Sequence, residues 1–283
     1  MSKRKILYLV KYIAAIFVLV IFLFPIYWIF ITAFKPEPEW FSMPPVFWPS
    51  KFTLANFLGT GSSTFGTTTT SIAGIVPFLR NSVVIATSTS LISTFIAALA
   101  AYSISRTKIG GTGLAGWFIS MRLLPPIASA IPLYVIFSKI KLLNTWLALI
   151  LPYLVPATAL SIWLLISFFN EIPQEIEEAA YIDGASRMQS FIHVVLPLSA
   201  PGLAAAAILA FIQSWGEFLL ALILTNNASA QTLPVYLGRY ITGWRVAWGP
   251  LSAAGLVTML PVIIFALIFQ RYLIRGLTLG AVK

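Results

Sequence analysis

The sequence of 283 residues contains no cysteine and a single histidine, His193. A chain without cysteine has no disulfide framework, no thiolate metal ligand and no cysteine nucleophile, and one imidazole cannot form a metal-binding cluster. We therefore expect this chain to hold no metal and no catalytic residues.

Charged residues are also scarce, at 9% of the chain against 59% hydrophobic residues, and the mean hydropathy is +0.92. Soluble domains carry about 25% charged residues, so a membrane protein is predicted, with the bilayer as its solvent. The net charge of +10 comes from 18 Lys and Arg without a dense patch. This distribution argues against nucleic-acid binding and favours cytoplasmic loops that face anionic membrane lipid.

Six apolar runs are long enough to be membrane helices, which need about 20 mostly apolar residues. We predict an all-α polytopic membrane protein, with residues 1–283 as one transmembrane domain. The spans are expected at roughly residues 12–34, 78–101, 113–137, 146–168, 202–224 and 251–271. Prolines in the third and fourth spans free backbone carbonyls and predict kinks that can line a cavity; they are Pro125, Pro126, Pro132, Pro152 and Pro156.

Four basic residues, Lys3, Arg4, Lys5 and Lys11, precede the first predicted span. The positive-inside rule places the N-terminus in the cytoplasm, and six crossings return the C-terminus to the same side. The first apolar run exceeds the apolar region of a secretory signal, so it is expected to remain as an anchor. The chain is thus predicted to be a multi-pass protein of the plasma (inner) membrane with cytoplasmic termini.

The segment of residues 170–201, between the fourth and fifth predicted spans, contains most of the acidic residues. Pro173 suits the first turn of a helix, which is expected to run to about Ile182. Asp183 and Gly184 should form the turn that follows, because glycine readily takes a positive φ.

A second short helix is expected from about Ser186 to Pro197, which should end it. Its apolar residues recur at i, i+3, i+4 and i+7; they are Met188, Phe191, Ile192 and Val195. This apolar stripe needs a surface to cover. The segment is therefore predicted to be a cytoplasmic helical hairpin that docks into a cleft on another protein. The alternative is an amphipathic loop on the membrane surface. The acidic first arm argues against this alternative, because membrane-surface helices favour Lys and Arg on their polar face.

The same segment resembles the EAA-x3-G-x9-I-x-LP signature of ABC importer membrane subunits. The matching residues are Glu178, Ala179, Ala180, Gly184, Val194 in place of Ile, Leu196 and Pro197. The similarity covers nearly the whole chain and is closest to permeases of the carbohydrate-uptake branch, such as the maltose and trehalose importer permeases. The fifth span of those permeases often reads Trp-Asn-Glu/Asp-Phe, and here Gly216 stands in place of the Asn.

The resemblance implies the fold of a six-helix type I importer permease whose hairpin is a coupling helix seated in a cytoplasmic ATPase subunit. Glu178 would be the charged contact, Ala179 and Ala180 the small face, and Asp183 with Gly184 the turn, while Leu196 and Pro197 complete the motif. No G-x-x-x-x-G-K-[ST] segment is present, so a partner ATPase dimer would bind ATP and Mg. A second homologous permease and an extracytoplasmic sugar-binding protein are also implied.

Two charged residues stand out inside the predicted spans, Arg122 in the third and Glu217 in the fifth, because a central charge costs about 2.5–3.5 kcal/mol on insertion scales. Gln213 and Trp215 flank Glu217 and add the hydrogen-bonding and stacking groups that sugars use. We hypothesise that these four residues line the translocation pathway or contact the sister permease. Alternatively, Glu217 pairs with Arg122 or caps backbone, and Arg122 snorkels to the membrane face.

Other functions stay open. An ABC permease for another solute, such as a polyamine or a phosphate compound, would carry the same motif. An ion-coupled secondary transporter would be expected to show more intramembrane carboxylates and paired repeats with broken helices, which the sequence does not reveal. A membrane enzyme would need a convergent catalytic set. We favour the permease subunit of an ATP-driven importer of a mono- or disaccharide.

Overall fold

The computed structural model describes residues 3–60 and 72–279, and this part of the chain consists of helices, turns and one isolated β-bridge between Ile241 and Val246. Four described helices are long and apolar enough to cross a membrane, and two bent helix pairs raise the possible total to six. The predicted all-α membrane fold is confirmed. The contacts divide the chain into two compact units, residues 1–76 with 236–260 and residues 77–235 with 261–283.

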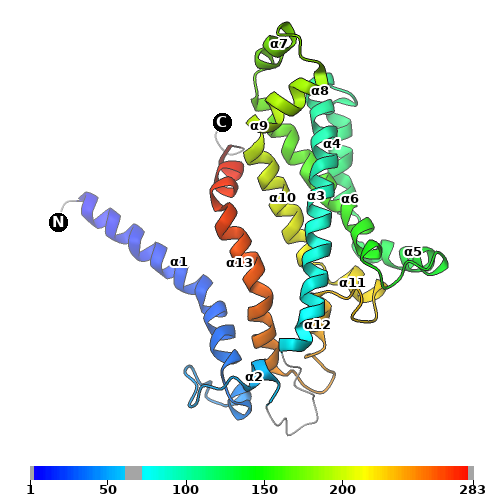
Figure 1. Cartoon of the computed structure of the whole chain (residues 1–283). Helices are drawn as coiled ribbons and strands as arrows, with labels where there is room; N and C mark the ends of the chain where they lie inside the picture. The colour runs from blue at the N-terminus through cyan, green and yellow to red at the C-terminus, as the bar shows by residue number, and fades with distance from the viewer. Residues whose placement is uncertain (1–2, 61–71, 280–283) are drawn as a thin grey trace. The chain divides into compact units, whose positions relative to one another are not determined.

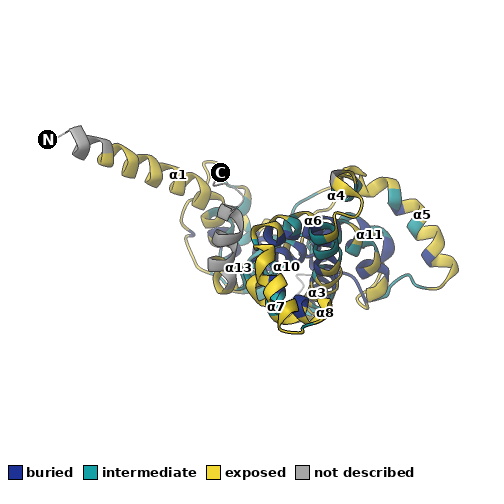
Figure 2. Ribbon diagram, turned by 90° about the horizontal axis from the view of Figure 1, so that it is seen from above, coloured by how far each residue is buried: buried dark blue, intermediate teal, exposed yellow. Residues whose placement is uncertain are grey.

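The first unit contains α1 (Lys3–Ala33), the short helices η1 (Glu37–Phe41), α2 (Ala55–Leu58) and η2 (Ile72–Ile75), and the first part of α13 (Trp248–Leu279). The described side chains of α1 are exposed along most of the helix (Figure 2), and none of its apolar window is buried. An apolar helix with an exposed surface suits contact with lipid. The connection α12 (Leu233–Gly238) passes from the second unit into the first.

The second unit is built around three helices (Figure 1). Helices α6 (Trp146–Glu171) and α10 (Ala200–Trp215) pack along one another, and α3 (Val76–Thr107) shares a buried apolar cluster with both. Helix α3 is continuous through its Ser/Thr-rich part, where the hydroxyls of Ser90 and Ser93 donate to backbone carbonyls. The Ser90 hydroxyl, for example, donates to the Ala207 carbonyl of α10 at 2.6 Å. Helix α10 approaches α6 closely, since a Cβ at Gly202 would lie 2.5 Å from the Phe168 ring.

Two of the predicted spans are interrupted: the kink expected from the prolines of the third span is present as a full break, and the break in the fifth span was not predicted. Residues 113–137 form α4 (Gly111–Ser120), η3 (Met121–Leu123) and α5 (Pro126–Lys139), and the chain bends by 81° at the break. Consecutive prolines at 125 and 126 cause this break, because neither can donate a backbone hydrogen bond. Residues 202–224 are divided between α10 and α11 (Leu219–Leu224).

The predicted hairpin lies at one end of the second unit (Figure 1) and consists of α7 (Gln174–Ile182), α8 (Arg187–Ser190), the π-helical turn η4 (Phe191–Val195) and α9 (Leu196–Leu198). Pro197 does not end the second arm, contrary to the prediction. It lies in the first turn of α9, where a missing N–H is tolerated. The helix bends by 76° only after Leu198, and α10 follows.

Candidate functional site

The turn of the hairpin is formed as the sequence predicted. Gly184 has φ +88°, a conformation that favours glycine, and α7 ends in two backbone bonds of the Schellman type. The Gly184 N–H donates to the Tyr181 carbonyl at 3.0 Å, and the Ala185 N–H donates to the Ala180 carbonyl at 2.9 Å. The turn therefore fixes the direction in which the chain leaves α7.

The second arm begins with a capping box that the sequence analysis did not identify. The Gln189 N–H donates to the Ser186 hydroxyl at 3.3 Å, and the Ser186 N–H donates to Gln189 Oε1 at 2.8 Å. This reciprocal pair satisfies two donors that a helix start otherwise leaves open. Both ends of the turn are thus locally fixed.

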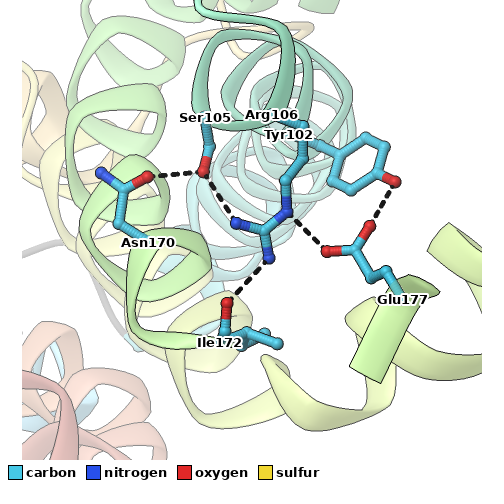
Figure 3. A network of polar contacts seen from close by, with 6 residues as sticks. All are labelled: Tyr102, Ser105, Arg106, Asn170, Ile172 and Glu177. Atoms are coloured by element: carbon cyan, nitrogen blue, oxygen red, sulfur yellow. Dashed lines mark hydrogen bonds and ion pairs between the residues drawn. The ribbon is translucent and has the colours of Figure 1, made fainter. Parts of the chain in front are cut away.

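A buried ion pair attaches the first arm to the transmembrane bundle (Figure 3). Glu177 is 3% exposed, and its Oε1 accepts from Arg106 Nε at 2.5 Å while its Oε2 accepts from the Tyr102 hydroxyl at 2.7 Å. Arg106 Nη2 also donates to the Ile172 carbonyl at 3.1 Å, between α6 and α7. The C-terminal end of α3 therefore holds both the start of the hairpin and its acidic helix.

The same network extends to the end of α6. The Ser105 hydroxyl donates to Asn170 Oδ1 at 2.6 Å, and Arg106 Nη1 donates to the Ser105 oxygen at 3.4 Å (Figure 3). Charge-assisted bonds of this kind are roughly twice as strong as neutral ones. The network therefore ties α3, α6 and α7 into one joint.

Apolar packing attaches the second arm. Phe191 and Val195 are buried in a core cluster with residues of α3, α6 and α10. The Phe191 ring lies 4.6 Å from the Tyr102 ring, centroid to centroid. The predicted apolar stripe is therefore divided: these two residues face the bundle, whereas Met188 and Ile192 are 58% and 45% exposed.

The motif residues occupy the outer side of this joint. Most of them are exposed, namely Glu178, Ala179, Asp183, Gly184 and Pro197, while Ala180 and Leu196 are half-buried. Ile182, at the end of α7, is 86% exposed. The hairpin thus has a buried base and an exposed tip that combines acidic, small and apolar side chains.

Sequence reasoning missed the buried base, because Glu177 and Glu178 are adjacent and equally acidic. Two partial signals were available: one turn along α7, Tyr181 lies on the same side as Glu177, and Arg106 is the basic residue in the last turn of α3. Nothing in the sequence alone paired Arg106 with either glutamate.

The second candidate site is a cavity of about 590 Å³ among α5, α6, α10 and α11. It is lined by Arg122, Gln213 and Glu217, together with three of the prolines expected to open kinks, Pro126, Pro152 and Pro156. The volume falls in the range of about 300–1,000 Å³ typical of small-molecule pockets. Three of the four predicted pathway residues are therefore brought together.

Glu217 lies in the break between α10 and α11, where it caps the second helix. Its Oε1 accepts from the Leu220 N–H at 2.9 Å, and its Oε2 accepts from the Ala221 N–H at 3.2 Å and from the Tyr153 hydroxyl at 2.5 Å. A carboxylate at a helix N-terminus is favoured by the helix dipole. Of the two structural roles considered for Glu217, backbone capping is the one observed.

The other candidates differ in their surroundings. Gln213 Oε1 is buried without a hydrogen-bond partner among the described residues. Arg122 is exposed, and the ion pairs of the described chain do not join it to Glu217. Trp215 is buried outside the cavity lining and stacks on Phe211 at 5.5 Å between ring centroids, so it packs the bundle.

A family model described as "binding-protein-dependent transport system inner membrane component" matches residues 93–279, which include the hairpin and the cavity. This chain belongs to that family. It is a membrane permease component and not itself an enzyme. The family also argues against an ion-coupled secondary transporter. The sequence analysis had counted the lack of broken helices against such a transporter, and that part of the argument was wrong because two spans are broken.

Named relatives cover almost the whole chain. The trehalose/maltose transport system permease protein MalG of Thermococcus litoralis is 35% identical over 96% of this chain and 95% of its own length. The sulfoquinovosyl glycerol transport system permease protein SmoH of Agrobacterium fabrum is 38% identical over 96% and 93%. The trehalose transport system permease protein SugB of Mycobacterium tuberculosis is 38% identical over 92% of each.

A solved structure shares the fold. It is that of a bacterial ABC transporter involved in the import of the acidic polysaccharide alginate, with a TM-score of 0.73 and 23% sequence identity over 96% of this chain and 98% of the other. The predicted permease fold is confirmed.

Proposed function

We propose that this chain is the permease subunit of an ABC importer for a small sugar, that it pairs with a second homologous permease, and that two ATPase subunits and an extracytoplasmic sugar-binding protein complete the transporter. ATP and Mg bind to the ATPase subunits. The hairpin passes the ATPase movement to the bundle.

One observation carries the coupling role: the hairpin is fixed at its base and exposed at its tip. The base joins α3, α6 and α7 through Glu177 and Arg106, and Phe191 is buried beside it. The tip presents Glu178 and Ile182 to solvent. An element attached in this way moves as a rigid body with the bundle when a partner displaces its tip.

The cavity supports a role in translocation. It is lined by the Arg122 guanidinium, the Glu217 carboxylate and the Gln213 amide between apolar walls, groups that can hydrogen-bond a polyhydroxylated ligand. Three relatives carry trehalose, maltose or sulfoquinovosyl glycerol in their names. These relatives favour a mono- or disaccharide over a polyamine or a phosphate compound.

Coupling can be tested in the reconstituted transporter with Glu178→Gln and Ile182→Ser, matched against Gln174→Ala at the start of α7. The first two variants should lower sugar-stimulated ATP hydrolysis while the permease remains folded. Equal stimulation in all three would contradict the coupling role of the tip.

Translocation can be tested with Glu217→Gln and Tyr153→Phe. The first replaces one of the two carboxylate acceptors that cap α11, and the second leaves the cap intact but removes a hydroxyl from the cavity. Reduced uptake by Tyr153→Phe at unchanged thermal stability would support pathway lining. Unchanged uptake in both variants would show that Glu217 is only a structural cap.

Substrate class is decided by uptake competition with a panel of monosaccharides, disaccharides, polyamines and organic phosphates. A sugar is expected to compete. Competition by a polyamine or phosphate compound alone would overturn the sugar assignment.

A further inference from the structure

A second cavity, of about 350 Å³, lies in the first unit where α1 ends. Its wall includes three tryptophans and one ammonium group; the residues that matter here are Trp28, Thr32, Lys35, Trp40, Trp248 and Gly255. The family match begins at residue 93, so the part of this wall that α1 and the segment after it contribute lies outside the matched region.

Lys35 is a buried cation that forms no ion pair with a carboxylate of the described residues. Its side chain is 1% exposed, and Nζ lies 4.0 Å from the centroid of the Trp28 ring. The neighbouring carboxylates are engaged elsewhere: Glu37 forms an ion pair with Arg245 at 2.7 Å, and Glu39 accepts from the backbone N–H and the hydroxyl of Ser50. Burial lowers the pKa of Lys35 from its ordinary value of 10.5, and the negative charge of Glu39 only partly opposes this.

The backbone around Lys35 is rigidly held, so the position of the cation is not incidental. The Lys35 carbonyl accepts from Trp40 Nε1 at 3.1 Å and from Asn56 Nδ2 at 2.9 Å. Asn56 Nδ2 also donates to the Ala33 carbonyl at 2.9 Å. These bonds direct the chain across the end of α1 and place Lys35 in the cavity wall.

A second polar group in the wall has no partner. Thr32 is 5% exposed, lines the same cavity, and its Oγ1 has no hydrogen bond among the described residues. A buried ammonium and a buried hydroxyl without acceptors are both costly. An anion that accepts from both groups would offset this cost.

The surroundings indicate the chemistry of that anion. Apart from these two groups the wall is mainly aromatic and aliphatic, and α1, which ends at the cavity, exposes apolar side chains along most of its described length. Tryptophans with a nearby cation are typical of the headgroup level of a bilayer. Basic pockets between membrane helices bind lipid headgroups on the cytoplasmic side of a membrane, and on the predicted topology this cavity would be such a pocket at the outer headgroup level.

We propose that this cavity binds the phosphate-bearing headgroup of an anionic membrane phospholipid, with the Lys35 ammonium and the Thr32 hydroxyl on the phosphate. The tryptophans contact the glycerol and the first methylenes of the acyl chains. The lipid fixes the end of α1 against the start of α13 within this unit.

The test is a titration of the purified transporter complex, depleted of lipid, with phosphatidylglycerol and with phosphatidylcholine of identical acyl chains, followed by native mass spectrometry. Phosphatidylglycerol should bind its tightest site at least about tenfold more strongly than phosphatidylcholine does, as expected when a charge-assisted bond is made. Lys35→Gln should abolish this preference and Lys35→Arg should keep it. Lys51→Gln, an exposed lysine of the same segment, is the matched control and should behave as wild type.

A second variant keeps the test decisive if Lys35→Gln fails to fold. A Cβ at Gly255 would meet no atom within 4 Å, so Gly255→Leu fills the cavity without touching its polar groups and should also remove the preference. Equal binding of the two lipids, or a preference that survives in Gly255→Leu, would overturn the proposal. Displacement of the lipid by millimolar inorganic phosphate would assign the site to a free anion. Crosslinking of Lys35 to an acidic side chain of another subunit would assign it to a protein contact. Either result would overturn the lipid site.

Discussion

Two cations of this molecule, the half-buried Arg106 and the buried Lys35, are stabilised in opposite ways. Arg106, in the second unit, has a side chain that is 12% exposed and donates to Glu177, to the Ile172 carbonyl and to Ser105. Lys35, in the first unit, is 1% exposed and is balanced by the face of Trp28. A guanidinium with a full set of acceptors acts as a fixed joint, whereas an ammonium with an aromatic neighbour and no acceptor is prepared for a ligand.

The largest expected effect is that of Arg106→Leu. This change leaves the buried Glu177 carboxylate without its partner, which costs about 3–5 kcal/mol when a buried pair is broken. Thermal unfolding of the transporter in detergent and sugar-stimulated ATP hydrolysis should both show the loss. The double variant Arg106→Leu with Glu177→Leu should be less destabilised than Arg106→Leu alone, and the opposite order would show that the pair is not what holds the hairpin.

A smaller effect is expected from Gly184→Ala, at the turn of the hairpin. The added methyl group meets no atom within 4 Å, so the cost comes from the φ of +88° alone and should be about 1–2 kcal/mol. Sugar-stimulated ATP hydrolysis should fall, whereas the melting temperature of the transmembrane bundle should change little. Gly113→Ala, also without a neighbour within 4 Å and without a positive φ, is the control and should lose nothing.

Lys35→Met should change the stability of the lipid-depleted transporter by less than about 1 kcal/mol, because the lost contact with Trp28 is offset by removal of a buried charge. The same variant in anionic lipid should lose the stabilisation that the wild type gains there. A loss as large as that of Arg106→Leu in the absence of lipid would erase the contrast between the two cations.

The smallest effect concerns pH. Because the pKa of Lys35 is lowered in the folded protein, the unfolded chain binds more protons between that lowered value and 10.5, and the free energy of unfolding rises with pH in this window. As the pH is raised from about 8 to 10.5, the melting temperature of the wild type should therefore rise relative to that of Lys35→Gln. Bound anionic lipid should flatten this change, since it restores the charged form.

The sequence predicted those features that recur along the chain or that mark the end of a helix. Apolar runs indicated the spans, and Gly184 with the acidic helix before it indicated the hairpin turn, because these features depend on local physics. The sequence could not show which of Glu177 and Glu178 is buried, since that depends on Arg106 from a distant helix. The prolines of the third span predicted a bend at Pro125 and Pro126, whereas the break near Gly216 was not predicted, because hydropathy counts apolar residues and does not report bends.

The candidate sites show a similar division. Glu217 and Gln213 were identified because polar residues in an apolar run are conspicuous, yet their contacts with Tyr153 and α11 come from tertiary packing. Trp215 was assigned to the pathway by its neighbours in sequence, but the helix turns its ring onto Phe211. Lys35 was overlooked because a lysine among glutamates reads as an ordinary polar loop.

The exposed tip of the hairpin also bears on how the subunit is produced. Ile182, Met188 and Ile192 expose apolar surface on one short element, and such surface promotes self-association when no partner covers it. If the proposed ATPase covers this surface, permease copies made in excess of the ATPase should aggregate and be degraded first, and balanced synthesis of the two subunits would then be needed.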